Sequence, residues 1–75
     1  MGLSEDGYFT DSNKEENDVT KEMMKYAAKK VALMDSSKIG KKYVYNLCHI
    51  TDVDEVICEE ELPDYIIKYL FEKYK

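Results

Sequence analysis

The spacing of apolar residues predicts a helix over residues 18–34, DVTKEMMKYAAKKVALM. Apolar residues recur there at steps of four, four, four and three, on one helix face: Val19, Met23, Ala27, Val31 and Met34. Asp18 is the predicted N-cap, because its carboxylate can accept a hydrogen bond from an unpaired amide of the first turn. The serines and Gly40 of DSSKIG predict a loop after this helix.

Two strands are predicted next. Residues 42–50, KYVYNLCHI, are rich in tyrosine and β-branched side chains, and VICEEEL at 56–62 can return as a second strand. A loop at 52–54 puts the apolar residues on one face of the resulting hairpin: Val44, Cys48, Ile50, Val56, Cys58 and Leu62. A helix over 52–62 remains the alternative, since Val53, Val56 and Ile57 also fit helical spacing.

A second helix is predicted over residues 63–75, with Pro63 in its first turn, where a missing N–H costs nothing. Residues 1–17 contain five acids and little periodic apolar character, which predicts a flexible acidic tail. The chain is therefore interpreted as this tail followed by one α+β domain at 18–75, with the order α-β-β-α. A lone hairpin is marginal, so we expect a homodimer that completes a four-stranded sheet.

The net charge is −5, and all eleven basic residues are lysine. The negative charge disfavours non-specific attachment to nucleic acid or anionic lipid, and arginine, the usual bidentate reader of phosphate and guanine, is absent. No apolar run has the length of a membrane span, so no membrane association and a cytoplasmic protein are expected. In that compartment Cys48 and Cys58 are expected as packed, reduced thiols.

The segment TDVDEVICEEELPD at 51–64 gathers seven carboxylates without a lysine. They are Asp52, Asp54, Glu55, Glu59, Glu60, Glu61 and Asp64. Like charges at this density repel one another and destabilise a fold unless something balances them. Residues 21–42 carry seven lysines against two acids and are one possible source of balance. Carboxylates left unbalanced on a rigid scaffold would attract a basic groove, and we predict this set as a partner-binding site.

Catalytic and metal-binding patterns are not recognisable in the sequence. Asp52 and Asp54 lack the glycine and the terminal glutamate of an EF-hand loop, and a core this small can hardly form the cleft of a glycosidase. His49 and Cys48 are neighbours on a predicted strand and point to opposite faces, so they cannot act as a catalytic pair. We expect no enzymatic activity, no cofactor and no metal.

In overall character the chain resembles the small acidic proteins with which bacteriophages disable host machinery. The likeness is carried by VDEVICEEELPD, by the acidic SEDGYFTDSNKEEN, and by the lysine- and tyrosine-rich, arginine-free remainder. The resemblance implies a non-enzymatic inhibitor that mimics DNA. Its partner would be a basic DNA-binding host protein in the host cell cytoplasm: a nucleoid-associated protein, a polymerase subunit or a nuclease.

The alternative function is direct nucleic-acid binding through the lysine-rich face of the first helix and the loop after it. This set comprises Lys21, Lys25, Lys29, Lys30, Lys38, Lys41 and Lys42. A row of lysines is also the ordinary polar face of an amphipathic helix, and without arginine we do not expect direct nucleic-acid binding.

Overall fold

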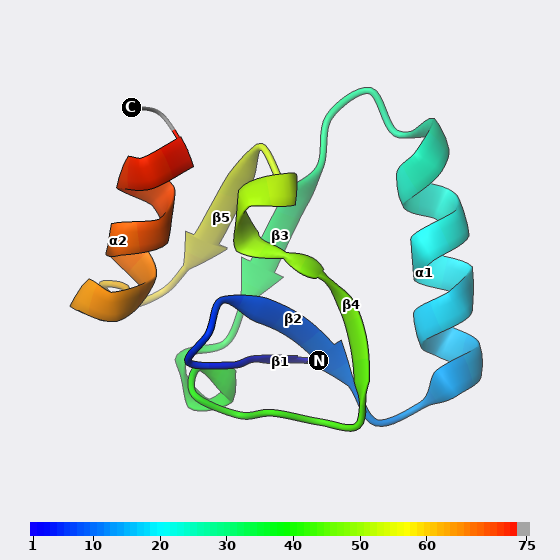
Figure 1. Cartoon of the computed structure of the whole chain (residues 1–75), viewed down its shortest axis with the longest axis horizontal. Coiled ribbons are helices and arrows are strands. Elements are labelled where there is room, and N and C mark those ends of the chain that lie inside the picture. Colours follow the sequence, from blue (N-terminus) through cyan, green and yellow to red (C-terminus); the bar gives the residue numbers. More distant parts are fainter. Residues whose placement is uncertain (74–75) are drawn as a thin grey trace.

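The computed structural model of the chain describes residues 1–73, which form short strands, two α-helices and two 3₁₀ turns, η1 and η2 (Figure 1). The elements follow in the order β1 (Gly2–Leu3), β2 (Tyr8–Asp11), α1 (Lys14–Tyr26), β3 (Val31–Met34), η1 (Ser36–Lys38), β4 (Tyr45–His49), η2 (Ile50–Asp52), β5 (Glu55–Cys58) and α2 (Asp64–Lys73). The α+β class predicted from the sequence is confirmed. A homodimer stays a prediction.

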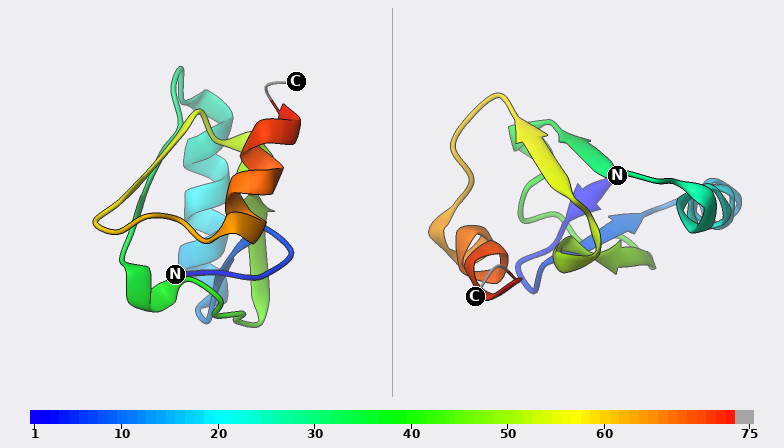
Figure 2. Two further views of the ribbon diagram at one scale, coloured as in Figure 1. Left: turned by 90° about the vertical axis from the view of Figure 1, so that its left-hand side faces the viewer. Right: turned by 90° about the horizontal axis from the view of Figure 1, so that it is seen from above.

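The strands form two small sheets. In the first, β2 lies between β1 and β4 and is antiparallel to both. In the second, β3 and β5 are parallel, with Leu33 opposite Ile57. Figure 2 shows the β3–β5 pair at one side of the molecule. Helix α1 lies beyond one end of the sheets, and α2 lies near the opposite end.

The core lies between the two sheets and is closed at one end by α2. Its apolar members come from β1, β2, β3, η2, α2 and the residue after η2: Leu3, Phe9, Ala32, Met34, Ile50, Val53 and Ile66. Helix α1 is joined to β4 by a buried polar contact, because Asn17 donates from Nδ2 to the carbonyl of Asn46 at 3.1 Å. A buried amide of this kind needs a partner, so the bond fixes where the helix sits.

Residues 1–17 differ from the flexible tail that was predicted. They form β1, β2 and the start of α1, and the side chains of Leu3 and Phe9 are 0% and 1% exposed. Gly7 turns the chain between the two strands with a φ of +87°, a conformation that costs glycine little. The segment is ordered because two apolar side chains enter the core while its acids stay outside.

The first helix is also displaced from its predicted position at 18–34. Helix α1 begins after Asn13, whose side chain accepts a hydrogen bond from the Glu16 N–H, and it ends before Ala27. Asp18 is therefore inside the helix and is not its N-cap. Residues 31–34 form β3, in which exposed and buried side chains alternate as a strand requires. Val31 and Met34 fitted the helical spacing only by coincidence.

The predicted hairpin is wrong in its pairing, although strands occur at 45–49 and 55–58. Strand β4 pairs with β2, and β5 pairs with β3. The chain leaves β4 through η2, where Ile50 is buried and its N–H donates to the Gly7 carbonyl at 2.7 Å. Strand β2, which lies in the segment predicted to be a tail, takes the place beside β4 that was predicted for β5. The alternative helix at 52–62 does not form either.

The final helix is confirmed as α2, which begins at Asp64 directly after Pro63. Residues 74 and 75 of the predicted helix lie outside the described part of the chain. Over residues 1–73 neither helix combines the length and the apolar character needed to cross a bilayer.

Candidate functional site

The acidic segment 52–64 was the predicted site, and its first two acids bond to backbone within the chain. Asp52 accepts the N–H of His49 at 3.1 Å, which closes the η2 turn. Asp54 accepts the N–H of Lys30 at 2.7 Å and so fastens the start of β3 to the loop before β5. Both carboxylates therefore hold local structure together.

Two further acids are engaged by the segments around β3. Glu55 forms an ion pair of 3.5 Å with Lys29, and both side chains are about half exposed or more. Glu59 accepts the Ser36 N–H at 2.8 Å. Hydrogen bonding by the Ser36 side chain, and after it by this backbone N–H, lowers the pKa of Glu59 to about 2. The carboxylate of Glu59 thus connects the end of β5 to η1.

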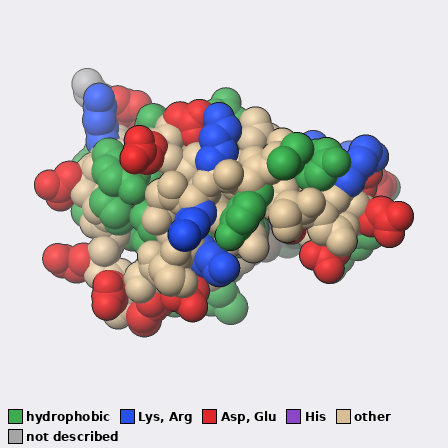
Figure 3. Space-filling view, turned by 90° about the horizontal axis from the view of Figure 1, so that it is seen from below, with side chains coloured by type: hydrophobic (Ala, Val, Ile, Leu, Met, Phe, Trp, Pro, Cys, Tyr) green, Lys and Arg blue, Asp and Glu red, His purple; other side chains and the backbone are tan. Residues whose placement is uncertain are grey.

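Glu60, Glu61 and Asp64 are the three remaining members of the predicted set. They are exposed, and no hydrogen bond or ion pair joins their carboxylates to another residue within 1–73. Figure 3 shows acidic side chains at both ends of one face of the molecule, several of them at the α2 end, with some of the lysines in the middle. The seven carboxylates are therefore divided between internal contacts and three free groups.

The lysines of the alternative site do not form one surface patch of free cations. Lys25 pairs with Glu22 at 3.0 Å, and Lys42 lies 3.9 Å from Asp6. Lys29 is the partner of Glu55. These lysines are partly neutralised, and they lie on a helix, just before a strand and in a loop. They therefore form no continuous basic surface for a phosphate backbone.

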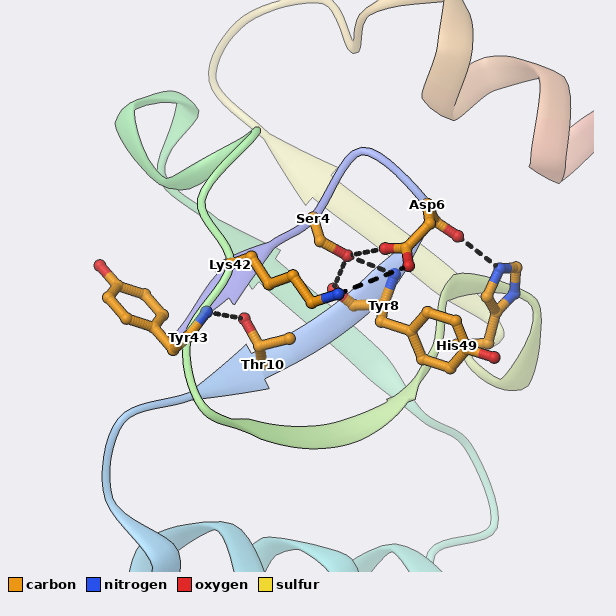
Figure 4. A network of polar contacts seen from close by, with 7 residues as sticks. All are labelled: Ser4, Asp6, Tyr8, Thr10, Lys42, Tyr43 and His49. Atoms are coloured by element: carbon orange, nitrogen blue, oxygen red, sulfur yellow. Dashed lines mark hydrogen bonds and ion pairs between the residues drawn. The ribbon is translucent and has the colours of Figure 1, made fainter.

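A polar network at the β1–β2 loop was not anticipated from the sequence (Figure 4). Ser4 is 2% exposed, and its hydroxyl donates to the carboxylate of Asp6. The Lys42 ammonium approaches the same carboxylate from the segment before β4. The hydrogen bond from Ser4, assisted by the charge of Lys42, lowers the pKa of Asp6, so this group is an anion at neutral pH.

These side chains border an open hollow of about 380 Å³. It is lined by Ser4, Glu5, Asp6, Gly40 and Lys42. The two segments that form it, 4–6 and 40–42, are joined where the Gly40 N–H donates to the carbonyl of Leu3. The lining offers two carboxylates, which can accept hydrogen bonds from hydroxyl groups, and one ammonium, which can contact an anionic group.

His49, at the end of β4, contacts the β1–β2 loop. Its Nδ1 accepts the Thr51 N–H at 3.3 Å, and its Nε2 lies 3.1 Å from the Asp6 carbonyl oxygen. This pair of contacts fits the neutral tautomer with its proton on Nε2, which then donates to Asp6. The ring also packs edge-on against Tyr8 and Tyr69, at centroid distances of 4.8 and 5.1 Å.

A second hollow, of about 350 Å³, is a mainly apolar groove between α1 and the start of β3. Its lining includes Met23, Val31 and Cys48. Burial raises the pKa of the Cys48 thiol to about 11, so this sulfur is a packed thiol and a poor nucleophile at neutral pH. Both cysteines are free.

Metal-binding geometry is absent from residues 1–73: no three His, Cys, Asp or Glu side chains there come together as ligands would. The polar hollow was missed because its residues fell in the segment read as a tail and in the loop after the first helix. One available signal was SEDG at 4–7, a serine and two acids followed by a glycine, a pattern typical of a tight turn.

Comparison with known proteins gives one finding. A family model described as the DeoR C terminal sensor domain matches residues 1–60. This match includes the polar hollow, His49 and the acids up to Glu60. Neither the curated proteins nor the solved structures contain a match.

Proposed function

The chain belongs to the DeoR C-terminal sensor domain family, and from this premise we propose that it is a non-enzymatic sensing module that binds a small metabolite. A sensor needs a site whose occupation changes the protein, and the hollow beside the β1–β2 loop has the suitable size and chemistry. A cytoplasmic location and the absence of catalysis are parts of this proposal.

One observation carries the choice of site. Lys42 and Asp6 come from different segments, lie 3.9 Å apart and border the same hollow. An ammonium can bind a phosphate or carboxylate of the ligand, whereas the carboxylates of Glu5 and Asp6 can accept hydrogen bonds from hydroxyl groups. Because the Lys42 side chain is 64% exposed, a ligand can reach it. We therefore propose a hydroxylated metabolite that carries an anionic group.

The experiment is a calorimetric titration of the full chain with ribose 5-phosphate as the probe. Ribose and inorganic phosphate, titrated separately, test whether both halves of the probe are needed. We expect the Lys42→Met variant to bind at least about tenfold more weakly, because it loses the charge that holds the anion. Lys41→Met is the matched control, since the neighbouring lysine does not line the hollow. Equal losses in the two variants, or no binding by the wild type, would contradict the proposal.

We propose mimicry of DNA by the 52–64 acids as a second function. Its support is the exposure of Glu60, Glu61 and Asp64, which have no partner among residues 1–73. These three carboxylates would attract a basic DNA-binding partner through charge, so association should slow as salt is added.

A further inference from the structure

The β3–β5 pair has an uncovered apolar face. Parallel strands are found almost only in sheets whose two faces are both covered. Here Ala32 and Met34 point into the core, whereas Val31, Leu33 and Ile57 point away from it. Leu33 is 72% exposed, and it lies opposite Ile57 in the strand register. Neither helix lies over this side of the strands (Figure 2).

Helix α1 has an uncovered apolar stripe of its own. Val19, Met23 and Tyr26 are spaced by four and three residues, so they share one helix face. All three are exposed, with Met23 at 68%. The helix contacts the rest of the molecule through its other side, where Asn17 is buried. The stripe therefore has no layer to pack against.

The two apolar surfaces meet at a groove, and their borders differ in charge. Met23 from the stripe and Val31 from β3 both line the groove of about 350 Å³ between α1 and β3. Lys29 and Lys30 line the same groove. Helical spacing places Glu15, Glu16 and Glu22 beside the stripe, and of these Glu22 is paired with Lys25 of its own chain. A helix with such borders would meet a basic edge if it lay on the groove.

From these observations we infer that the surface is covered by a second copy of this chain, with α1 of one copy lying on the β3–β5 face of the other. Each chain has an uncovered apolar stripe on α1 and an uncovered apolar face on the β3–β5 pair. In a two-fold symmetric dimer, α1 of each copy can cover the β3–β5 face of the other. Size supports this choice of occupant. A compact monomer of this mass exposes about 4,800 Å², whereas the chain exposes 5245 Å².

The distribution of side chains points the same way. Among the described residues eleven large hydrophobic side chains are exposed, and only seven hydrophobic residues form the buried core. A core this small rarely sustains a fold of this length without help from oligomerisation. The inference does not depend on the sensing function, since it concerns a surface outside the polar hollow.

Light scattering coupled to size exclusion tests the inference on the full chain. At about 100 μM we expect twice the mass of one chain. Leu33→Lys and Met23→Asp should each raise the dimer dissociation constant at least about tenfold, because each buries a charge in the interface. Both positions are exposed in the single chain, so circular dichroism should show an unchanged fold. Val44→Lys is the control, since Val44 is 80% exposed and lies outside this surface.

The double variant with both Leu33→Lys and Met23→Asp tests whether these two positions face each other across the dimer interface. If α1 of one copy lies on the β3–β5 face of the other, the lysine and the aspartate face each other twice, and dimerisation should recover at least partly. A wild type that is monomeric at this concentration overturns the inference. A dimer that Leu33→Lys leaves intact, or that Val44→Lys disrupts equally, overturns it as well.

Discussion

His49 and Asp6 are joined by a hydrogen bond of 3.1 Å between the imidazole Nε2 and the Asp6 backbone carbonyl. This bond ties the end of β4 to the loop that lines the polar hollow. Because the same ring packs against Tyr69 of α2, the loop and the final helix are both held by one side chain. Displacement of this loop would therefore disturb the contact between His49 and α2.

The close packing at this point predicts that Gly7→Ala strongly destabilises the fold. A Cβ at residue 7 would lie 2.8 Å from Nε2 of His49 and 3.0 Å from the Tyr69 ring, and the φ of +87° adds strain for any other residue. We expect the free energy of unfolding to fall by about 2–4 kcal/mol. Urea denaturation followed by circular dichroism measures this loss.

Gly40→Ala is the matched control for this prediction. Gly40 has the same φ of +87°, but a Cβ there would meet only the Tyr65 hydroxyl, at 3.6 Å. The control therefore carries the backbone strain without the collision, and we expect it to lose about 1–2 kcal/mol. Equal losses in the two variants would show that crowding by His49 and Tyr69 has no weight.

Burial of Phe9 predicts that the first eleven residues are an essential part of the fold. Phe9→Ala removes a ring that is 1% exposed, and we expect a loss of about 3–5 kcal/mol. This is a large part of the stability of so small a domain. Thermal unfolding measures the effect, with Val44→Ala as the control at an exposed position. If Phe9→Ala unfolds at the same temperature as the control, the segment 1–11 does not pack as described.

Local signals in the sequence identified α2 and the existence of strands near 45–49 and 55–58. Pro63 and the dense apolar residues after it are sufficient to place a helix without tertiary information. Strand pairing is different, because it depends on segments distant along the chain. Phe9 and Thr10 belong to a strand of four residues within acidic sequence, so their periodicity is too short to recognise. Without that strand, β4 had no visible partner except β5.

The candidate site was harder to predict for the same reason. The density of acids at 52–64 is plain in the sequence, but the backbone amides that bind Asp54 and Glu59 lie 24 and 23 residues away. The hollow likewise combines Asp6 with Lys42, which only the fold brings together. A charge pattern identifies which groups are present, whereas their neutralisation is decided by tertiary contacts.

The net negative charge and the ion-paired lysines predict weak or absent binding to DNA itself. The chain carries a net charge of −5, and its lysines are interrupted by ion pairs. We expect no change in the fluorescence anisotropy of a labelled 20-base-pair duplex when the chain is added at low salt. Binding that disappears in a Lys21→Glu, Lys25→Glu variant would instead support the lysine-rich helix as a nucleic-acid site.

The hydrogen bond between Glu59 and Ser36 predicts a specific loss of stability in acid. In the folded chain the pKa of Glu59 is about 2, below its ordinary value of 4.5. The folded state therefore keeps this carboxylate ionised at pH values where the unfolded chain takes up a proton. The stabilising contribution is complete above about pH 4.5 and is lost as the pH falls towards 2.

Urea midpoints measured over this range, for the wild type and for Glu59→Gln, check the prediction. The glutamine cannot titrate, so we expect the advantage of the wild type to shrink between about pH 4.5 and 2. Glu60→Gln is the control, because it removes the same charge from a neighbouring residue that has no hydrogen-bond partner within 1–73. Its stability should follow the wild type across the range. Parallel curves for the wild type and Glu59→Gln would mean that Ser36 does not hold this carboxylate in solution.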